Sequence, residues 1–193
     1  MMEINLKELL EQGSLPDPVT YQYYKALCDN TIIINDEIND ILLEYAIIPL
    51  MNMDKDPDVE KINIILNTPG GDIYDGLALV SVLESLTTPT TLRIIGMAAS
   101  MGAIIAMAKN PNLKVVCDKF AVGLIHSGSQ YMSGSSHAVR DTFKFRERYE
   151  EKIKQYILSH TLIDEKMYAE IERQEFWMDA DDMLKYGIID EII

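Results

Sequence analysis

The sequence is poor in the features that bring a protein to a membrane or to nucleic acid. Its 193 residues include 31 acidic but only 17 basic side chains, which gives a net charge of −14. Nucleic acid and anionic membrane surfaces repel a polyanion, so this charge argues against both as partners. No apolar run reaches the roughly 18 residues that a membrane-spanning helix requires. We therefore expect a soluble protein.

Cysteine is also scarce. Cys28 and Cys117 belong to no C-x-x-C pair, and no cluster of cysteine and histidine has the spacing of a metal site. Isolated thiols suit a reducing compartment, where they act as small buried apolar residues. Residues 1–13 are acidic and amphipathic, and they lack the basic and apolar regions of a secretory signal. Together these features predict a cytoplasmic protein.

The pattern of apolar residues predicts an α/β fold in a single domain over residues 1–193. Apolar or β-branched runs alternate with segments of helical periodicity, which is typical of crossover connections and a mainly parallel sheet. Gly13, Pro16 and Pro18 are expected to break the chain before the first strand. Strands are predicted at 31–36, 62–67, 90–97, 112–118 and 120–127. Helices are predicted at 3–12, 37–52, 73–86, within 98–110, and at 136–160, 164–173 and 180–186, with a short strand between the last two.

The predicted helix at 136–160 is unusually long and charged. A helix of this length extends roughly 37 Å, too far to pack wholly on one small sheet. Its apolar positions form only a narrow stripe: Val139, Phe143, Phe145, Tyr149, Ile153 and Ile157. We expect the helix to project and to pack against another subunit; the alternative is a surface helix that covers the sheet.

Ser100 is the first candidate for catalysis. It lies in the segment 96–102 (GMAASMG), between an apolar strand and an apolar helix. Such a turn presents its side chain at the carboxyl end of the sheet, where α/β folds place their sites. Small neighbouring residues permit a tight turn. The segment is not a G-x-S-x-G motif, so the pattern leaves two roles open for Ser100, a nucleophile or a helix N-cap.

A serine nucleophile needs a base, and the chain has three histidines. His126 ends an apolar strand and precedes a Gly-containing loop, so it also lies at a strand end. The alternative for His126 is a plain buried histidine. His137 opens the charged helix and is expected to be solvated, whereas His160 lies at the end of that helix, where the dipole favours a charged ring.

An oxyanion hole needs backbone N–H groups directed at the developing charge. The turn 67–71 (NTPGG) can supply one, because its glycines allow close approach of a substrate. Met101, which follows Ser100 at a helix N-terminus, can supply another. The alternative is an ordinary strand-to-helix turn; a phosphate loop is disfavoured because no G-x-x-x-x-G-K-[ST] motif follows.

Four segments resemble the Clp protease proteolytic subunit family in order and spacing. They are NTPGGDI (67–73), GMAASMGA (96–103), LIH (124–126) and YGIIDEII (186–193). The resemblance covers roughly residues 20–193. It implies a crotonase-like (ClpP-like) α/β fold of repeated ββα units, with 136–160 as a projecting handle helix that joins heptameric rings stacked in pairs.

The resemblance also implies roles for individual residues. Ser100 corresponds to the nucleophile and His126 to the base. Gly71 and Met101 correspond to the residues whose N–H groups form the oxyanion hole. The family is a self-compartmentalised peptidase that works with an ATP-driven unfoldase. No ATP-binding motif appears in this chain, so ATP would act through that partner, and the peptidase chemistry requires no metal or organic cofactor.

The third member of the triad departs from the family pattern. The family has an aspartate twelve residues before the glycine of the Tyr-Gly pair; counting back from Gly187 gives Glu175. A glutamate can orient the imidazole but requires a different backbone placement. Asp179 is a substitute if the register of the sequence against the family pattern slips, and Glu175 is then a surface carboxylate.

Gln174 stands where the family often has an arginine for ring-to-ring contacts, with Arg173 one residue earlier.

Two further segments differ from the family pattern. The loop 127–131 (SGSQY) replaces a Gln-Pro segment with paired glycines, which bears on cleavage preference. Residues 1–20 are atypical in a region that gates the axial pore of the family.

These observations predict a serine endopeptidase that degrades unfolded polypeptides. One alternative is a catalytically impaired ring subunit with a structural or interaction role. The other is an acyl-CoA enzyme of the crotonase class, which shares the fold but uses no serine nucleophile.

Overall fold

A computed structural model describes residues 17–128 and 133–193. The described residues form a seven-stranded sheet in the order β1-β2-β3-β4-β7, and β5 joins β3 to β6. All pairings are parallel except that of β5 with β6. The strands are β1 (Thr31–Ile34), β2 (Ile62–Thr68), β3 (Thr90–Ala99), β4 (Leu113–Cys117), β5 (Val122–Ile125), β6 (Phe176–Met178) and β7 (Glu191–Ile192).

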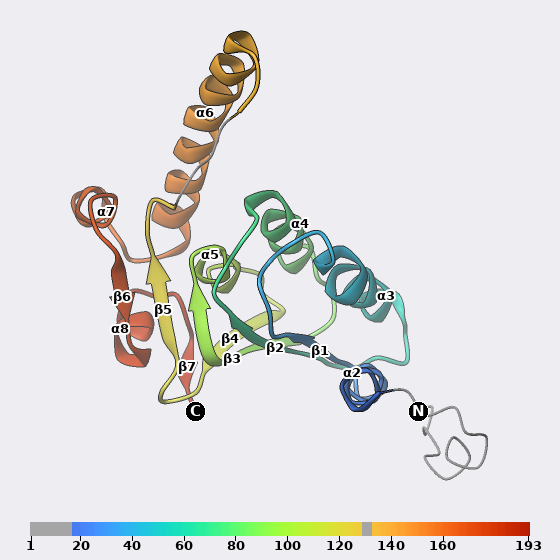
Figure 1. The fold of residues 1–193 in the computed structure, drawn as a ribbon. Coiled ribbons are helices and arrows are strands. Elements are labelled where there is room, and N and C mark those ends of the chain that lie inside the picture. The colour runs from blue at the N-terminus through green and yellow to red at the C-terminus, as the bar shows by residue number, and fades with distance from the viewer. Residues whose placement is uncertain (1–16, 129–132) are drawn as a thin grey trace.

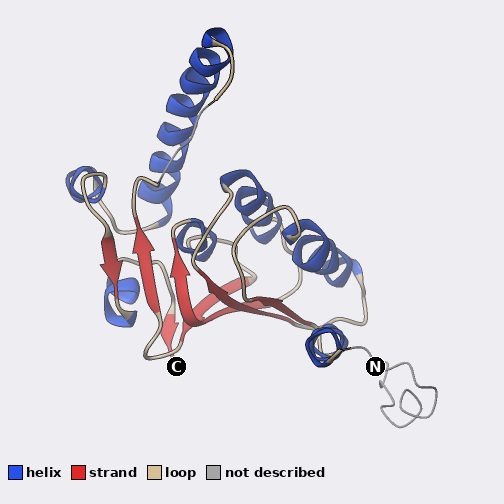
Figure 2. Ribbon diagram, in the orientation of Figure 1, coloured by secondary structure: helices blue, strands red, loops and turns tan. Residues whose placement is uncertain are grey.

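Helices cover the sheet and one helix leaves it. The ribbons in Figures 1 and 2 show α3, α4 and α5 over one face, while α6 extends away from the body. The described helices are α2 (Pro18–Cys28), the π-helix η1 (Leu43–Ile47), α3 (Ile48–Lys55), α4 (Ile73–Leu83), α5 (Met101–Ala106), α6 (Ser136–His160), α7 (Glu165–Ile171) and α8 (Ala180–Lys185). This mixed α/β architecture agrees with the predicted fold class.

The core lies between the sheet and the helices on that face. In β2 every second residue is buried, because successive side chains of a strand point to opposite faces. Leu79 and Leu83 of α4 are fully buried in the same cluster. The packed core fixes the strand ends from which the functional residues arise.

The sequence missed α2. Pro18 occupies the first turn of this helix, where a proline costs no hydrogen bond, and it does not act as a break. Asp17 caps the helix, since its Oδ1 accepts bonds from the N–H groups of Val19 (3.0 Å) and Thr20 (3.1 Å). The strand β7 was also not predicted, and the predicted helix at 3–12 lies outside the described residues.

The predicted helix at 37–52 begins later than expected. Ile38 is extended and forms a parallel bridge with Gly71, and helical structure starts only with η1. Pro49 has no N–H, so it cannot bond to the carbonyl of Tyr45 four residues earlier. The hydroxyl of Tyr23 on α2 donates to that carbonyl instead, at 2.5 Å. A π-helix next to a proline follows from this missing backbone donor.

The long helix α6 has the predicted bounds and projects as expected (Figure 1). Ile157, near its C-terminal end, is its one residue described as buried. Phe143 and Phe145 of its apolar stripe are 51% and 41% exposed. The middle of the stripe is therefore open to solvent, and the projecting helix does not cover the sheet (Figure 1).

Candidate active site

Ser100 follows β3 in a strained backbone conformation. Its φ of 53° and ψ of −117° lie where L-residues are rare. The N–H of Ser100 donates to the carbonyl of Leu124 at 2.8 Å, and its own carbonyl accepts from the N–H of Ala103 at 3.0 Å. The side chain makes no capping hydrogen bond to α5, so the N-cap alternative for Oγ is wrong. The sharp turn leaves this hydroxyl free to face a partner across the sheet edge.

That partner is His126. Its Nε2 lies 2.9 Å from Oγ of Ser100, and both residues are half-buried. The contact follows from topology, because β5 pairs in parallel with the end of β3 and the carboxyl ends of parallel strands meet at one edge. His137 is exposed at the start of α6, and His160 is engaged elsewhere. Of the three histidines, only His126 contacts Ser100.

The turn after β2 packs directly against the Ser100 segment. A Cβ on Gly70 would lie 2.6 Å from both the Ala99 carbonyl oxygen and the Ser100 Cβ, so only glycine fits this approach. Ile38 accepts from the N–H of Asp72 (2.7 Å) and donates to the carbonyl of Gly70 (2.8 Å). The sequence-predicted turn is thereby held against the segment that carries Ser100.

Gly71 and Met101, the two residues predicted to form an oxyanion hole, lie beside Ser100. Ile38 bonds to the residues on either side of Gly71, and in a parallel pair the N–H of the intervening residue then points the other way. The N–H of Met101 belongs to the first turn of α5, which an α-helix leaves unpaired. Both residues line the same cavity as Ser100 and His126.

Asn67 bridges an irregularity beneath this turn. Leu66 pairs with Ile94, but Thr68 pairs with Ala98, so β3 has two extra residues at this point. The Asn67 Oδ1 accepts from the N–H of Met97 at 3.0 Å, and its Nδ2 donates to Asn35 at 2.7 Å.

This irregularity re-aims the end of β3. The Asn67 amide takes the place of ladder bonds that the bulge removes, and a Cβ on Gly96 would lie 2.6 Å from its Oδ1. The sequence analysis did not single out Asn67. Its position directly before the Thr-Pro-Gly-Gly turn was the available signal.

Glu175 lies opposite His126 but does not contact it. In the antiparallel β5–β6 pair Ile125 faces Phe176, so one further step places Glu175 across from His126. The Glu175 carboxylate instead accepts a hydrogen bond from the indole Nε1–H of Trp177 at 3.1 Å. In the described part of the chain, no hydrogen bond or ion pair joins Glu175 to His126. The structure thus places Glu175 across from His126, but its carboxylate is turned along β6 towards Trp177.

Asp179 has a different structural role. Its Oδ1 accepts from the N–H of Asp182 at 2.9 Å and caps α8. The β5–β6 register places Asp179 opposite Val122, four residues before His126. In this register Glu175, and not Asp179, lies across from His126.

A cavity of about 500 Å³ opens beside Ser100 and His126. One wall is aliphatic and is contributed by several elements: Ile125, Ile153, Ile157 and Ile171. The remaining lining includes more acidic than basic groups: Glu37, Asp72, Glu150, Glu172 and Arg146. The cavity can hold an apolar side chain next to the hydroxyl of Ser100. The sequence analysis assigned Ile153 and Ile157 to a subunit contact and missed their place in this wall.

Cys117 is no competing nucleophile. It is fully buried at the end of β4. Burial, followed by the nearby Asp118 and Asp181, raises the pKa of Cys117 to about 11. Its thiol therefore stays protonated near neutral pH, as expected for a small apolar core residue.

No helix in residues 17–128 or 133–193 has both the length and the apolar character needed to cross a membrane.

Comparison with known proteins gives a consistent result along the chain. The family model described as Clp protease matches residues 16–193. The chain is 30% identical over 194 aligned residues to the ATP-dependent Clp protease proteolytic subunit of Streptococcus uberis, with 96% of this chain and 95% of the relative covered. The subunit of the same name from Lactococcus lactis subsp. cremoris is 29% identical, with 96% and 94% covered. That from Deinococcus radiodurans is 26% identical over 172 residues, with 89% and 83% covered.

Proposed function

This chain belongs to the Clp protease family, and from that premise we propose that Ser100 is its nucleophile and His126 its general base. The protein is a serine-type peptidase, a hydrolase of peptide bonds, as its family and relatives indicate. The observation that carries the residue assignment is the 2.9 Å contact between Oγ of Ser100 and Nε2 of His126. This distance allows direct proton transfer from the hydroxyl to the ring.

Acylation proceeds at the carboxyl edge of the sheet. As Oγ of Ser100 attacks the substrate carbonyl, Nε2 of His126 accepts the hydroxyl proton. The N–H groups of Gly71 and Met101 donate to the developing oxyanion. Collapse of this intermediate breaks the peptide bond, and the leaving amine takes the proton from His126. The product is an acyl ester on Ser100.

Deacylation reverses the proton movements. Water attacks the ester while His126 accepts a proton from it, and the oxyanion again forms between Gly71 and Met101. Ser100 then leaves as the restored hydroxyl. The protein contributes only side chains and backbone N–H groups to this proposed cycle.

Glu175 is the proposed acid that orients His126. Glu175 lies across from His126, one residue beyond the last β5–β6 pair. Rotation about the side-chain torsions of Glu175 moves its carboxylate away from Trp177 and towards Nδ1 of His126. A carboxylate there would stabilise the imidazolium that forms during acylation. The other candidate, Asp179, keeps its place as the cap of α8.

The proposed context is a compartment built from copies of this chain. The substrates are polypeptides, and an ATP-dependent unfoldase supplies them. Stacked heptameric rings in the cytoplasm are the proposed assembly. The exposed Phe143 and Phe145 of the projecting α6 fit a contact between rings. The charge of −14 disfavours nucleic acid or an anionic membrane as a further partner.

A fluorophosphonate probe tests the catalytic assignment. Purified protein should be labelled at Ser100, and Ser100→Ala should abolish both labelling and peptide hydrolysis. Ser81→Ala is the matched control, since the hydroxyl of Ser81 donates to the carbonyl of Leu77 within α4. Mass measurement under the same conditions should give a particle of about fourteen chains.

Two outcomes would replace the proposal. Absence of labelling in every assembly state would indicate a ring subunit without catalytic activity. An acyl-CoA activity that survives Ser100→Ala would indicate a crotonase-class enzyme.

A further inference from the structure

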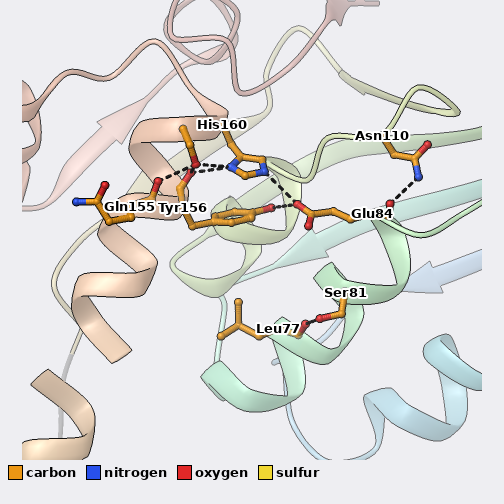
Figure 3. Close-up of polar contacts among 8 residues, drawn as sticks. Leu77, Ser81, Glu84, Asn110, Gln155, Tyr156 and His160 are labelled. Atoms are coloured by element: carbon orange, nitrogen blue, oxygen red, sulfur yellow. Dashed lines mark hydrogen bonds and ion pairs between the residues drawn. The ribbon is translucent and has the colours of Figure 1, made fainter. Parts of the chain in front are cut away.

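A polar network distant in sequence from the catalytic pair ties the base of α6 to the end of α4. Figure 3 shows Glu84, the residue that follows α4, facing Tyr156 and His160 of α6. The Tyr156 hydroxyl donates to Oε1 of Glu84 at 2.9 Å, and Nε2 of His160 lies 3.2 Å from the same oxygen. The two rings stack with centroids 4.0 Å apart. One carboxylate oxygen thus holds two successive turns of α6.

The second ring nitrogen of His160 has partners within α6. Its Nδ1 lies 2.9 Å from the carbonyl of Tyr156 and 2.9 Å from Oγ of Ser159 (Figure 3). A doubly protonated ring donates Nδ1–H to that carbonyl. A neutral ring protonated on Nε2 accepts from the Ser159 hydroxyl instead. Nε2 of His160 lies 3.2 Å from Oε1 of Glu84, and the two form an ion pair when the ring is doubly protonated.

The other two parts of the network are also held in place. Burial, followed by the hydrogen bond to Glu84, raises the pKa of Tyr156 far above its ordinary value, so its hydroxyl remains a donor. The backbone of Glu84 is fixed from a third element, because Nδ2 of Asn110 donates to its carbonyl at 2.9 Å (Figure 3). The acceptor for α6 is therefore rigidly placed.

The base of α6 is also part of the cavity beside Ser100. Ile153 and Ile157, one turn apart, line this cavity, and Ile157 is the buried residue of α6. An α-helix moves as a rod, so a rotation or shift at its base displaces both isoleucines together. Tyr156 lies between them in the chain, so its bond to Glu84 acts at the same turn of the helix.

We infer that Glu84 is a positioning residue of the substrate cavity. It does not line the cavity. It acts through Tyr156 and His160, which hold the aliphatic wall formed by Ile153 and Ile157 against the catalytic pair. The consequence is selectivity for a large apolar substrate side chain, which packs well only when this wall is in place. The inference rests on the proposed function, since it takes the cavity as the place where a peptide binds.

Three substitutions distinguish three effects on substrate binding: loss of the hydrogen-bond acceptor at Glu84, loss of its charge, and a general loss of fold stability. Glu84→Ala removes both the acceptor of the Tyr156 hydrogen bond and the ion-pair partner of His160. Glu84→Gln keeps Oε1 as an acceptor without the charge, and Tyr156→Phe removes a single donor. Two peptide substrates are compared, with leucine or alanine before the cleaved bond. For the leucine peptide, KM should rise about tenfold in Glu84→Ala and about threefold in Tyr156→Phe, while kcat changes by less than about twofold. Glu84→Gln should remain within about twofold of the wild type.

Glu165→Ala is the control, because it also removes a carboxylate that contacts α6 from a neighbouring segment. Glu165 is the first residue of α7 and its side chain is 68% exposed; the substitution removes its ion pair with Lys154 of α6 and should leave KM unchanged. An unchanged KM for the leucine peptide in both Glu84→Ala and Tyr156→Phe overturns the inference, even if their melting temperatures fall. If Glu84→Ala does not fold, Tyr156→Phe decides alone. A wild type that neither reacts with the fluorophosphonate nor cleaves either peptide overturns the proposed function and the inference with it.

Discussion

The indole Nε1–H of Trp177 donates a hydrogen bond of 3.1 Å to Oε2 of Glu175, two residues earlier in the chain. Residues two apart on an extended strand point to the same face, so Trp177 is the donor nearest to this carboxylate. His126 lies on the neighbouring strand and faces Glu175 in register. In this structure the carboxylate binds the indole, whereas the proposed orienting role requires it to turn towards His126.

Glu175→Gln tests whether the carboxylate takes part in catalysis. Loss of the charge that stabilises the imidazolium should lower kcat by about 10²–10⁴-fold without unfolding the protein. Asp179→Ala is the matched substitution in β6–α8. It should lower the free energy of unfolding by about 1 kcal/mol through loss of the α8 cap, with kcat unchanged. Steady-state kinetics and denaturant unfolding measure both; equal kcat in Glu175→Gln and wild type would leave a Ser100–His126 dyad.

Trp177→Phe tests the competition for this carboxylate. The substitution keeps an aromatic ring at a half-exposed position but removes the N–H donor. Glu175 is then released towards His126, and kcat should rise by about threefold. The gain should be absent when Glu175→Gln is combined with Trp177→Phe, because the two effects act through one carboxylate. A fall in kcat would mean that the indole helps to orient Glu175.

Gly70→Ala tests the contact between the glycine turn and the nucleophile segment. The added Cβ meets the Ala99 carbonyl oxygen and the Ser100 Cβ at 2.6 Å, and the residue has a φ of +100°. We expect a loss of about 2–4 kcal/mol in the free energy of unfolding and slower labelling of Ser100. Gly128→Ala provides the comparison, because Gly128 has a φ of +74° and open space around its Cβ. Gly128→Ala should lower the free energy of unfolding by about 1 kcal/mol, through backbone strain alone.

Asn67→Ala tests the bridge under the active site. The N–H of Met97 loses its acceptor, which should lower stability by about 1–3 kcal/mol and slow fluorophosphonate labelling by about tenfold. Asn63→Ala, on the same strand, should leave the labelling rate unchanged. Equal labelling rates for Asn67→Ala and the wild type would show that the bulge needs no side-chain bridge to place Ser100.

Asp54 predicts a pH dependence of stability. Burial acts to raise the pKa of Asp54, but hydrogen bonds from the N–H groups of Thr88 (2.7 Å) and Thr87 (2.9 Å) outweigh it, and the net pKa is lowered. A depressed folded-state pKa contributes stability above the unfolded-state value, and this contribution disappears as pH falls through the folded-state value. The stability difference between wild type and Asp54→Asn should be constant above about pH 5 and should shrink below about pH 4. Urea unfolding across this range measures it, and a difference that does not shrink would contradict the assignment.

Much of the fold could be predicted because its elements follow local rules. The alternating apolar runs became strands, and the charged segment at 136–160 became a projecting helix with the predicted bounds. The misses also have local causes. Pro18 begins α2 and does not break the chain, and Pro49, in the first turn of α3, leaves the preceding π-helix without one backbone donor. In both places the meaning of a proline depends on which hydrogen bonds its neighbours can make.

The sequence by itself placed Ser100, His126 and the glycine turn at the ends of strands in a parallel sheet, and such ends share one edge. Their proposed roles came from the resemblance to the Clp protease proteolytic subunit family. Tertiary structure decided how these groups are oriented. The left-handed φ of Ser100, the two-residue shift bridged by Asn67 and the turn of Glu175 towards Trp177 all depend on contacts between strands that are distant in sequence. Such contacts are specified by packing and register, and no local pattern of residue types encodes them.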